Sequence, residues 1–308
     1  REKTRLVVVL LALLCFLLLF VGGPGAYTLR TVRYAWGLGH LFSFALWTFI
    51  YLRWRGDRPL VRSYGEALLL ALLLGGGTEL IQTGIPGREA TWPDLGLDLL
   101  GCLLALVLDR KLVHRLSAAR LWLVRMPVLL LACWVLLPLL RVALDDLQAW
   151  RQFPLLAGFE TELELGRWGG NSSRSLSEQH VFSGSKALRV ELNTSRYSGV
   201  ALKEFPADWS RYRAVRFQIF NPQPEPVALL FRIHDQHHRD HNNQYSDRYN
   251  TSLVALPGWT EQEIPLAEVE QAPKGRKMDM ARIAGLILFV GKLEQPYTFY
   301  LDEVRLVD

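Results

Sequence analysis

The sequence has few cysteines and few charges, and its second half has no long apolar run. Only 3 of the 308 residues are cysteine, and none follows residue 150, so no disulfide framework is expected there. Charged residues make up 21% of the chain, and the mean hydropathy is +0.12. These values exclude a purely soluble globular fold. The cysteines lie inside apolar runs, as small apolar side chains, at Cys15, Cys102 and Cys133.

The second half also lacks the positive charge that nucleic-acid binding requires. Residues 151–308 hold 19 Lys and Arg against 20 Asp and Glu, whereas residues 1–150 hold 16 against 10. Nucleic-acid-binding modules carry a clustered basic face on a soluble domain, so this class is excluded. The basic isoelectric point therefore belongs to the first half.

The first half does contain five long apolar runs. Some are shorter than the ~20 residues that a bilayer core needs, so we expect them to extend into their flanks. The sequence predicts an α-helical transmembrane bundle of about five spans over residues 1–150. A cleaved signal peptide is the alternative for the first run, because basic residues precede it and small residues follow it. The runs are Leu6–Val21, Leu38–Leu52, Ala67–Gln82, Leu95–Leu108 and Trp122–Leu140.

Lysine and arginine are unevenly distributed among the segments that flank these runs. Three precede the first run, four follow the second and five follow the fourth, while the other two connections together hold three. Because basic segments stay in the cytoplasm, we predict a multi-pass protein of the cell (inner) membrane with a cytoplasmic N-terminus. Five spans then place residues 151–308 outside the cytoplasm.

Polar residues at the expected outer ends of three runs form a candidate ligand-binding site. Glu79 and Gln82 are three residues apart and Asp94 and Asp98 are four apart, so each pair shares one helix face. Polar groups are costly in hydrocarbon, so each needs a partner or a function. We predict one outward-facing pocket formed by His40, Glu79, Gln82, Arg88, Asp94 and Asp98.

The same residues belong to a longer motif. It comprises Gly39-His40, Glu79-Leu80-Ile81-Gln82, Gly87-Arg88, Asp94 and Asp98-Leu99-Leu100-Gly101. This motif, within about residues 30–110, resembles that of the VanZ-like membrane family, which usually has Asn where this chain has Asp98. The resemblance implies a membrane domain connected with low-level resistance to the glycopeptide antibiotic teicoplanin, and so with the cell envelope.

Three interpretations of this polar cluster stay open. In one, the charged residues form an ion-pair lock that fixes helix packing, with His40 and Gln82 as hydrogen-bonding partners. In the second, Arg88 binds the phosphate of a lipid headgroup or lipid-linked glycan, and the carboxylates accept sugar hydroxyls. The third is acid–base catalysis, but no nucleophile motif or metal-ligand spacing accompanies the cluster. We therefore expect no catalytic residue, cofactor or metal.

The second half is a series of short segments of strand character separated by turns. Leu229, Phe231 and Ile233 alternate with other residues, and prolines lie at the ends of the segments. Seven or more such strands predict an all-β jelly-roll sandwich over residues 151–308. The expected strands are Ala187–Leu192, Ala214–Asn221, Val227–His234, Thr251–Leu256, Glu261–Pro265, Gly285–Val290 and Tyr297–Leu306.

Several local motifs recur along this half. They are Phe159-Glu160, Ser183–Leu188, Asp208–Tyr212, Asp247–Asn250 and Leu301–Leu306. Together they resemble galactose-binding-like jelly rolls, such as carbohydrate-binding modules and the complex I intermediate-associated protein family. The resemblance covers essentially all of residues 155–308, and it implies a domain that binds its ligand and does not cleave it.

The stretch His234–His241 contains four of the seven histidines. A site for a first-row metal ion is one interpretation, because His and Asp are good ligands for such ions. A polar loop between two strands is another. We predict that this region instead forms a sugar-facing rim, made by Asp235, His238, Tyr245, Asp247, Arg248 and Asn250.

These patterns together predict a membrane protein that binds an envelope glycan or a lipid-linked glycan at the outer leaflet. A membrane lipid, a glycan and a membrane protein are the expected partners, and nucleic acid is not. One alternative is a scaffold or assembly subunit of a membrane complex, which the resemblance to complex I-associated proteins favours. A second alternative is a membrane-embedded hydrolase or transferase.

Overall fold

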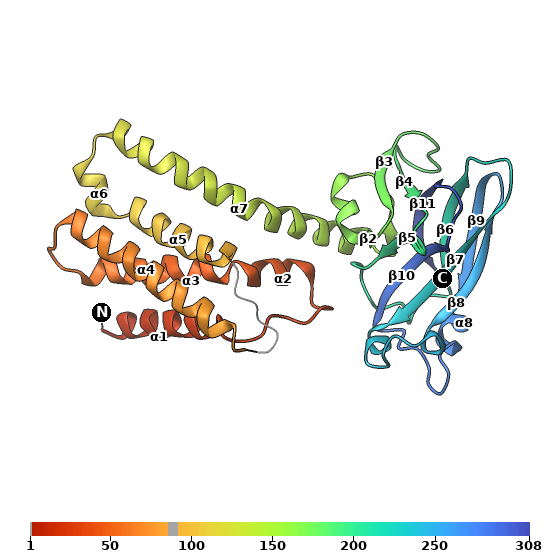
Figure 1. The fold of residues 1–308 in the computed structure, drawn as a ribbon, viewed down its shortest axis with the longest axis horizontal. Helices are drawn as coiled ribbons and strands as arrows, with labels where there is room; N and C mark the ends of the chain where they lie inside the picture. Colours follow the sequence, from red (N-terminus) through yellow and green to blue (C-terminus); the bar gives the residue numbers. More distant parts are fainter. Residues whose placement is uncertain (1, 86–91) are drawn as a thin grey trace. The chain divides into compact units, whose positions relative to one another are not determined.

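The computed structural model describes residues 2–85 and 92–308, and of residues 2–5 the backbone alone. The chain divides into two compact units, Arg1–Leu140 and Arg141–Asp308. The first unit is helical and the second is built mainly of strands (Figure 1). The boundary falls inside one long helix, α7 (Ala118–Gln152). The last three turns or so of that helix therefore belong to the second unit.

The first unit consists of apolar helices that approach one another at glycines. Besides α7, they are α1 (Glu2–Leu18), α2 (Arg30–Gly37), α3 (Gly39–Trp54), α4 (Leu60–Gln82), α5 (Trp92–Val107) and α6 (Arg110–Arg115). A Cβ on Gly101 of α5 would lie 2.3 Å from the carbonyl oxygen of Leu41 in α3. A Cβ on Gly75 of α4 would lie 2.6 Å from Oδ2 of Asp98 in α5. Glycine at these two positions therefore lets α3, α4 and α5 pack closely.

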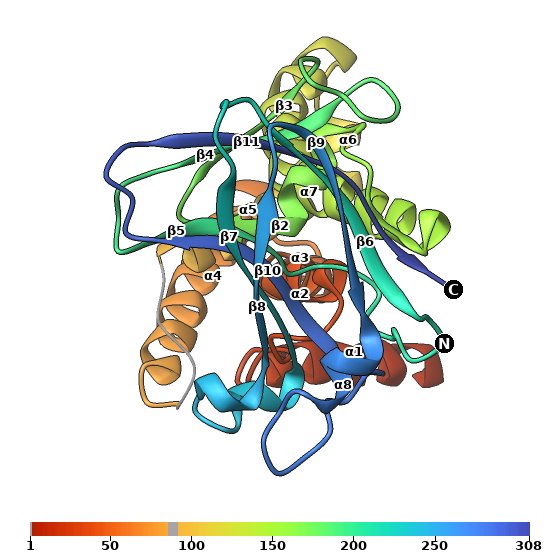
Figure 2. The same cartoon turned by 90° about the vertical axis from the view of Figure 1, so that its right-hand side faces the viewer.

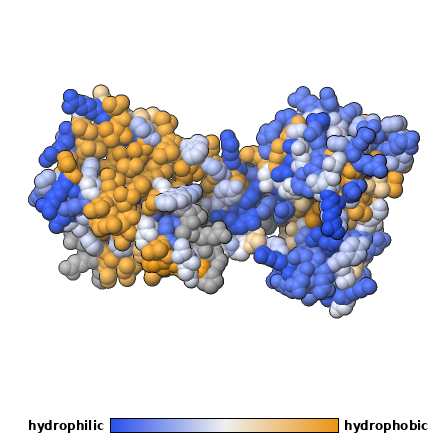
Figure 3. Space-filling model, viewed as in Figure 1, coloured by the Kyte–Doolittle hydropathy of each residue, from blue (hydrophilic) through white to orange (hydrophobic). Residues whose placement is uncertain are grey.

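Apolar side chains cover much of the outside of these helices (Figure 3). Helices α4 and α7 are each long and apolar enough to cross a membrane. The pair α2 and α3, bent by 44° at its break, meets the same criterion when taken together. By length and composition, the described residues therefore contain two candidate spans, or three if the bent pair is one span.

The prediction of five spans is not supported. The first apolar run corresponds to the helical segment Leu6–Leu18, and the fourth lies in α5, which has 16 residues. At 1.5 Å per residue, such a helix rises about 24 Å, less than the ~30 Å of a hydrocarbon core. These two runs were recognised by composition, and the helices that contain them are too short by this criterion.

The second unit is a sandwich of two antiparallel sheets, which confirms that part of the prediction (Figures 1 and 2). The strands are β1 (Leu155–Ala157), β2 (Trp168–Gly170), β3 (Ser173–Ser177), β4 (Ala187–Leu192), β5 (Tyr197–Leu202), β6 (Ala214–Asn221), β7 (Val227–Asp235), β8 (Tyr249–Ala255), β9 (Gly258–Pro265), β10 (Ile283–Gly291) and β11 (Tyr297–Val307). One sheet has the order β3-β4-β11-β6-β9, with β1 also paired to β11. The other, which we call the groove sheet, has the order β2-β5-β10-β7-β8.

The core of the sandwich lies between the two sheets. Phe217 of β6 stacks on Phe231 of β7 with ring centroids 5.3 Å apart, so the two sheets meet through this pair. Trp168 and Trp209 are buried in the same core, and neither ring is open to a ligand. Each of the seven strands expected from the sequence overlaps an observed strand. The short strands β1, β2, β3 and β5 were not anticipated.

A buried ion pair connects the last turns of α7 to the sandwich. Arg167 and Asp145 are each 1% exposed, with 2.8 Å between guanidinium nitrogen and carboxylate oxygen. The same guanidinium donates a hydrogen bond of 3.1 Å to the carbonyl oxygen of Leu156. Removing one partner of such a pair is more damaging than removing both, because it leaves a buried charge uncompensated.

We predict that Arg167→Met lowers the free energy of unfolding of the sandwich by about 3–5 kcal/mol, because it removes the cation facing the buried Asp145 carboxylate. The measurement is denaturant-induced unfolding of the full chain in detergent, followed by tryptophan fluorescence. The double variant Asp145→Leu/Arg167→Met is the control, and it should recover most of the loss. Equal losses in the single and double variants would contradict the prediction.

Candidate functional site

A groove of about 850 Å³ crosses the outer face of the groove sheet. Its floor follows from the strand register, because Phe289 of β10 lies opposite Gly199 of β5 and Leu230 of β7. These residues point away from the core, since their neighbours along each strand point into it. The lining residues are Gly170, Asn171, Tyr197, Ser198, Gly199, Val200, Ala201, Lys203, Leu230, Arg232, Tyr245, Arg248, Ile287 and Phe289.

Small residues leave open space above the floor of the groove, and aromatic rings lie at its rim. A Cβ on Gly199 would lie 2.4 Å from Cβ of Phe289, so only glycine fits there. Tyr197 is 54% exposed and meets Phe289 edge to face, with ring centroids 6.1 Å apart. Tyr245 is 71% exposed. The groove therefore combines an apolar floor with two accessible phenol rings.

The charged residues of the groove all carry the same sign. Lys203, Arg232 and Arg248 line it, and none of the lining residues is Asp or Glu. Burial, and then the nearby charge of Arg248, lowers the pKa of Arg232 to about 10. Burial also lowers the pKa of Arg248. The groove therefore holds positive charge, and none of the described lining residues carries the opposite charge.

The loop between β7 and β8 forms one wall of the groove, and Arg276 holds it in place. The guanidinium of Arg276 donates to both carboxylate oxygens of Asp235, at 2.5 and 2.9 Å, and to both of Asp247, at 2.6 and 2.9 Å. Burial raises the pKa of Asp235, but the hydrogen bonds from Arg276 and from the Asp279 backbone N–H outweigh it and the pKa is lowered overall. The hydrogen bonds from Arg276 are also the main cause of the lowered pKa of Asp247.

His238 completes this buried layer. Its Nδ1 lies 3.0 Å from the carbonyl oxygen and 3.2 Å from Oδ2 of Asp247. Its backbone N–H donates to Oδ1 of Asp235 at 3.2 Å. Burial is the main cause of its lowered pKa, so the imidazole is neutral at pH 7. These contacts tie the first turn of the loop to its last residues.

The six residues expected at the rim therefore fall into two layers. Asp235, His238 and Asp247 are buried, and the two carboxylates accept hydrogen bonds from within the protein. Nε2 of His238 is buried and has no hydrogen-bond partner among the described residues. Tyr245 and Arg248 line the groove. Asn250 is not among the lining residues but contacts both of these: its Oδ1 accepts a 2.9 Å hydrogen bond from Nε of Arg248, and its Nδ2 donates to the Tyr245 carbonyl at 3.1 Å.

Sequence reasoning missed several residues of this site. Tyr197, Arg232 and Phe289 come from three strands and meet only through the sheet register. Arg276 lies 29 residues from Asp247 and 41 from Asp235, in no recognisable motif. The only weak signal in the sequence was the preceding Gly275, because glycine often marks a turn. Its φ of +84° shows that the chain does turn there.

In the helical unit, four of the six expected cluster residues come together. His40 Nδ1 lies 2.9 Å from Asp98 Oδ1, and Gln82 Nε2 lies 3.4 Å from His40 Nε2. Gln82 also donates to the carbonyl oxygen of Leu19 at 2.8 Å. Ligand atoms of His40, Glu79 and Asp98 all lie within 4.8 Å of one another, which is a spacing that could hold a metal ion. All four side chains are buried among α3, α4 and α5.

The other two members of the expected cluster are placed differently. Asp94 is half-buried and lies one turn before Asp98 on α5. Arg88 lies outside the described residues, so its prediction as a phosphate-binding residue stays a prediction. The described part of the cluster is a set of buried hydrogen bonds between helices.

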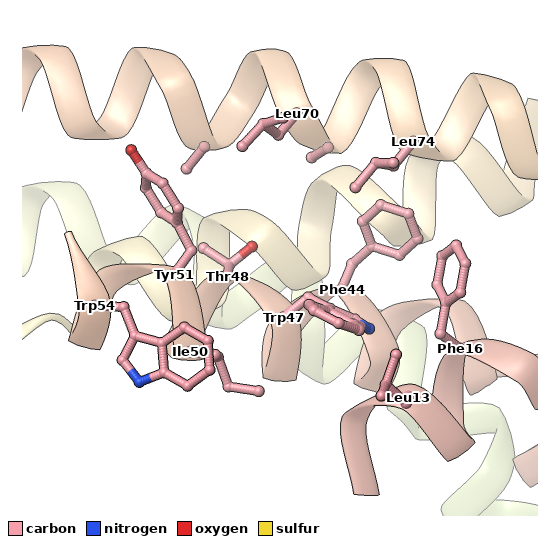
Figure 4. A pocket seen from close by; sticks show the side chains of 12 residues that line it. Leu13, Phe16, Phe44, Trp47, Thr48, Ile50, Tyr51, Trp54, Leu70 and Leu74 are labelled. Carbon is pink, nitrogen blue, oxygen red and sulfur yellow. The ribbon is translucent and has the colours of Figure 1, made fainter. Parts of the chain in front are cut away.

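A separate apolar pocket of about 430 Å³ lies among α1, α3 and α4 (Figure 4). Phe16, Phe44 and Trp47 stand on one side of it and Leu70 and Leu74 on another. Its lining is almost entirely hydrocarbon and aromatic ring. Such a pocket suits an apolar group and provides no charged side chain for catalysis.

No family model matches the chain, and no curated protein does. Among solved structures, the family 11 carbohydrate-binding module from Clostridium thermocellum in complex with a beta-1,3-1,4-mixed-linked tetrasaccharide is similar, at 17% identity and a TM-score of 0.39. The match covers 50% of this chain and 94% of that chain. The family 30 carbohydrate-binding module of a Clostridium thermocellum cellulosomal cellulase is 16% identical, with a TM-score of 0.36, over 46% of this chain and 91% of that chain.

An exo-beta-agarase is also similar, at 18% identity and a TM-score of 0.40, over 49% of this chain and 24% of that chain. Similarity at this level carries no argument about a ligand. The VanZ-like resemblance of the helical unit likewise stays a prediction, since no family model matches. The proposals below therefore rest on the residues of this chain.

We predict that Arg276→Gln destabilises the sandwich by about 3–5 kcal/mol at pH 7, because two buried carboxylates lose their shared cation. Asp235 and Asp247 have folded pKa values below the ordinary value of ~3.9, so the stability they contribute is present above that pH and is lost below it. The difference between wild type and variant should therefore shrink as the pH falls from 7 to 3. Urea unfolding across this range measures it.

The matched control for this prediction is Arg282→Gln. Arg282 is exposed and lies 3.8 Å from Asp279, and exposed pairs contribute at most ~1 kcal/mol. A stability difference between wild type and Arg276→Gln that does not change with pH would contradict the assigned role of Arg276.

Proposed function

We propose that this chain is a membrane-anchored glycan-binding protein whose saccharide lies in the groove. The observation that carries the proposal is the groove itself, in which an apolar floor, two exposed tyrosine rings and several polar donors share one open face. Binding sites for small ligands are concave and mostly apolar, with few polar groups. The volume of about 850 Å³ lies within the range of about 300–1,000 Å³ that is usual for such sites.

The groove residues match the two kinds of surface on a sugar ring. One face of a pyranose presents C–H bonds, which pack against aromatic rings such as Tyr197 and Tyr245. The hydroxyl groups around the ring accept hydrogen bonds from Lys203 and Arg248. None of the described residues that line the groove is Asp or Glu, so they provide no acid pair for glycoside hydrolysis. The function supported is binding.

The predicted rim residues take two roles in this proposal. Tyr245 and Arg248 touch the ligand, with Asn250 orienting Arg248 through its 2.9 Å hydrogen bond. Asp235, His238 and Asp247 hold the loop from behind. They act through the residues that they position and make no contact with the saccharide.

The helical unit anchors this binding domain in the cell (inner) membrane. Five Lys and Arg lie between residues 110 and 125, before the apolar part of α7. Within the rest of α7, only Arg141 and Arg151 follow it, beside Asp145 and Asp146. Because the flank richer in Lys and Arg stays in the cytoplasm, the sandwich lies outside the cytoplasm whatever the number of earlier spans. There it would meet an envelope glycan or a lipid-linked glycan.

For the buried cluster of His40, Glu79, Gln82 and Asp98, we propose a packing role. The hydrogen bonds of His40 and Gln82 run to Asp98 and to the Leu19 carbonyl, within the bundle. Polar contacts of this kind hold helices together in a bilayer. A lipid-headgroup site at this cluster would require these contacts to open.

We predict that Tyr245→Ala weakens saccharide binding about tenfold or more, because it removes the most exposed ring of the groove. Tenfold corresponds to about 1.4 kcal/mol. The measurement is calorimetry of the detergent-purified full chain with cellotetraose, chitotetraose and tetragalacturonate. Phe182→Ala is the matched control, since Phe182 is 51% exposed and lies outside the groove. If wild type binds none of the saccharides, or both variants lose binding equally, glycan binding in the groove is wrong.

We predict that a reporter fused after Asp308 is active outside the cytoplasm. A reporter placed after Ser117, between α6 and α7, should be active inside it and serves as the control. Paired alkaline phosphatase and fluorescent protein fusions measure both positions. If both fusions report the same side, α7 does not cross the membrane.

A further inference from the structure

We infer that the saccharide in the groove is acidic, with a carboxylate or sulfate group that meets Arg232 and Arg248. The inference rests on the proposed function and specifies its ligand class. Three cationic side chains line the groove without one carboxylate, although residues 151–308 as a whole have slightly more acidic than basic residues. The groove therefore has a local excess of positive charge that the domain as a whole lacks.

The environment of Arg232 is the main evidence for an acidic ligand. It lies on β7, inside the groove sheet, opposite Ile287 of β10 and Asn250 of β8. Its Nε is buried and has no hydrogen-bond partner among the described residues. A buried donor without an acceptor is costly, and so is a buried charge without a counter-charge. An oxyanion in the groove would relieve both costs.

Arg248 presents a second guanidinium to the same space. Its Nε is hydrogen-bonded to Asn250, and its guanidinium lies 5.1 Å from the centre of the Tyr245 ring. These contacts orient the group, and neither of them neutralises it. Burial opposes the charge of both arginines, and the charge of Arg248 further lowers the pKa of Arg232.

Several arginines elsewhere on the sandwich are paired with a carboxylate. Arg167, Arg216 and Arg276 each form an ion pair with Asp or Glu, as the exposed Arg189 does with Glu191. Within the part of the chain that the structure describes, no such pair is found for Arg232 or Arg248. Guanidinium groups bind carboxylate and sulfate oxygens through two parallel hydrogen bonds, so this pair of arginines fits an oxyanion on a sugar ring.

The arrangement also explains why both aromatic and cationic groups are present. Tyr197 and Phe289 can receive the C–H face of a ring, while Arg232 lies beside them on the floor. A neutral sugar would use the aromatic surface and leave the two guanidiniums without a counter-charge. An acidic sugar uses both surfaces.

The experiment compares acidic and neutral tetrasaccharides with the detergent-purified full chain, by calorimetry at 50 and 300 mM salt. Tetragalacturonate supplies carboxylates, a carrageenan tetrasaccharide supplies sulfates, and cellotetraose is neutral. We expect at least one acidic ligand to bind ten times more tightly than cellotetraose at 50 mM salt, with an advantage that falls at 300 mM. Preference between carboxylate and sulfate then identifies the anion.

Three variants locate the effect. Arg232→Gln should reduce binding of the acidic ligand about tenfold while changing that of cellotetraose less than twofold. Arg248→Gln should weaken binding of both ligands, because Arg248 also donates to sugar hydroxyls, and should weaken that of the acidic ligand about tenfold more. Arg189→Gln, on the other sheet, should change neither. Arg232→Gln removes a charge that has no partner, so it should not lower the unfolding temperature, and Arg248→Gln provides an independent test.

The outcomes separate the inference from the proposed function. Equal affinity for acidic and neutral ligands would overturn the inference and leave glycan binding standing. An acidic preference that persists in both groove variants would also overturn it. Absence of binding to every saccharide would refute the proposed function. In that case, arginine-dependent binding of the full chain to phosphatidylglycerol vesicles would assign the groove to an anionic membrane surface.

Discussion

The candidate site depends on one interaction, in which the guanidinium of Arg276 donates hydrogen bonds to the carboxylates of Asp235 and Asp247. Asp235 is the last residue of β7, and Asp247 lies two residues before Tyr249, where β8 begins, so a single guanidinium holds both ends of the loop. Because Asp235 is fully buried and Asp247 nearly so, this interaction is protected from screening by salt. The loop is thereby held in one conformation, in which Tyr245 and Arg248 face the groove.

The groove itself follows from the regular structure of the sheet. Strands β5, β10 and β7 lie side by side, so residues two apart on each strand form rows on the outer face. One row contains Gly199, Phe289 and Leu230, and the next contains Ala201, Ile287 and Arg232. Small residues on β5 beside large ones on β10 create the depression. A charged residue on such a central strand cannot reach far into solvent, which is why Arg232 is partly buried.

The sequence predicted the sandwich well because its long strands alternate with period two. The strands that it missed are short or rich in glycine and serine, as in β2 and β3, where no apolar alternation is visible. It overestimated the number of membrane spans, since composition identifies apolar runs and does not show where a helix ends. It singled out Tyr245, Arg248 and Asn250 within one short stretch of the chain, but it could not join them to residues on other strands without the register. The charge balance of the whole domain also hid the local excess of arginine.

The central claim is that an acidic saccharide occupies the groove between the loop and strands β5, β7 and β10. Hydrogen–deuterium exchange of the full chain in detergent, with and without saturating tetragalacturonate, tests it most directly. The account predicts slower exchange in residues 196–203 and 240–250, with little change in β4, β6 and the helices. Slower exchange confined to the helices or to the other sheet, or no change at all under saturating ligand, would contradict it.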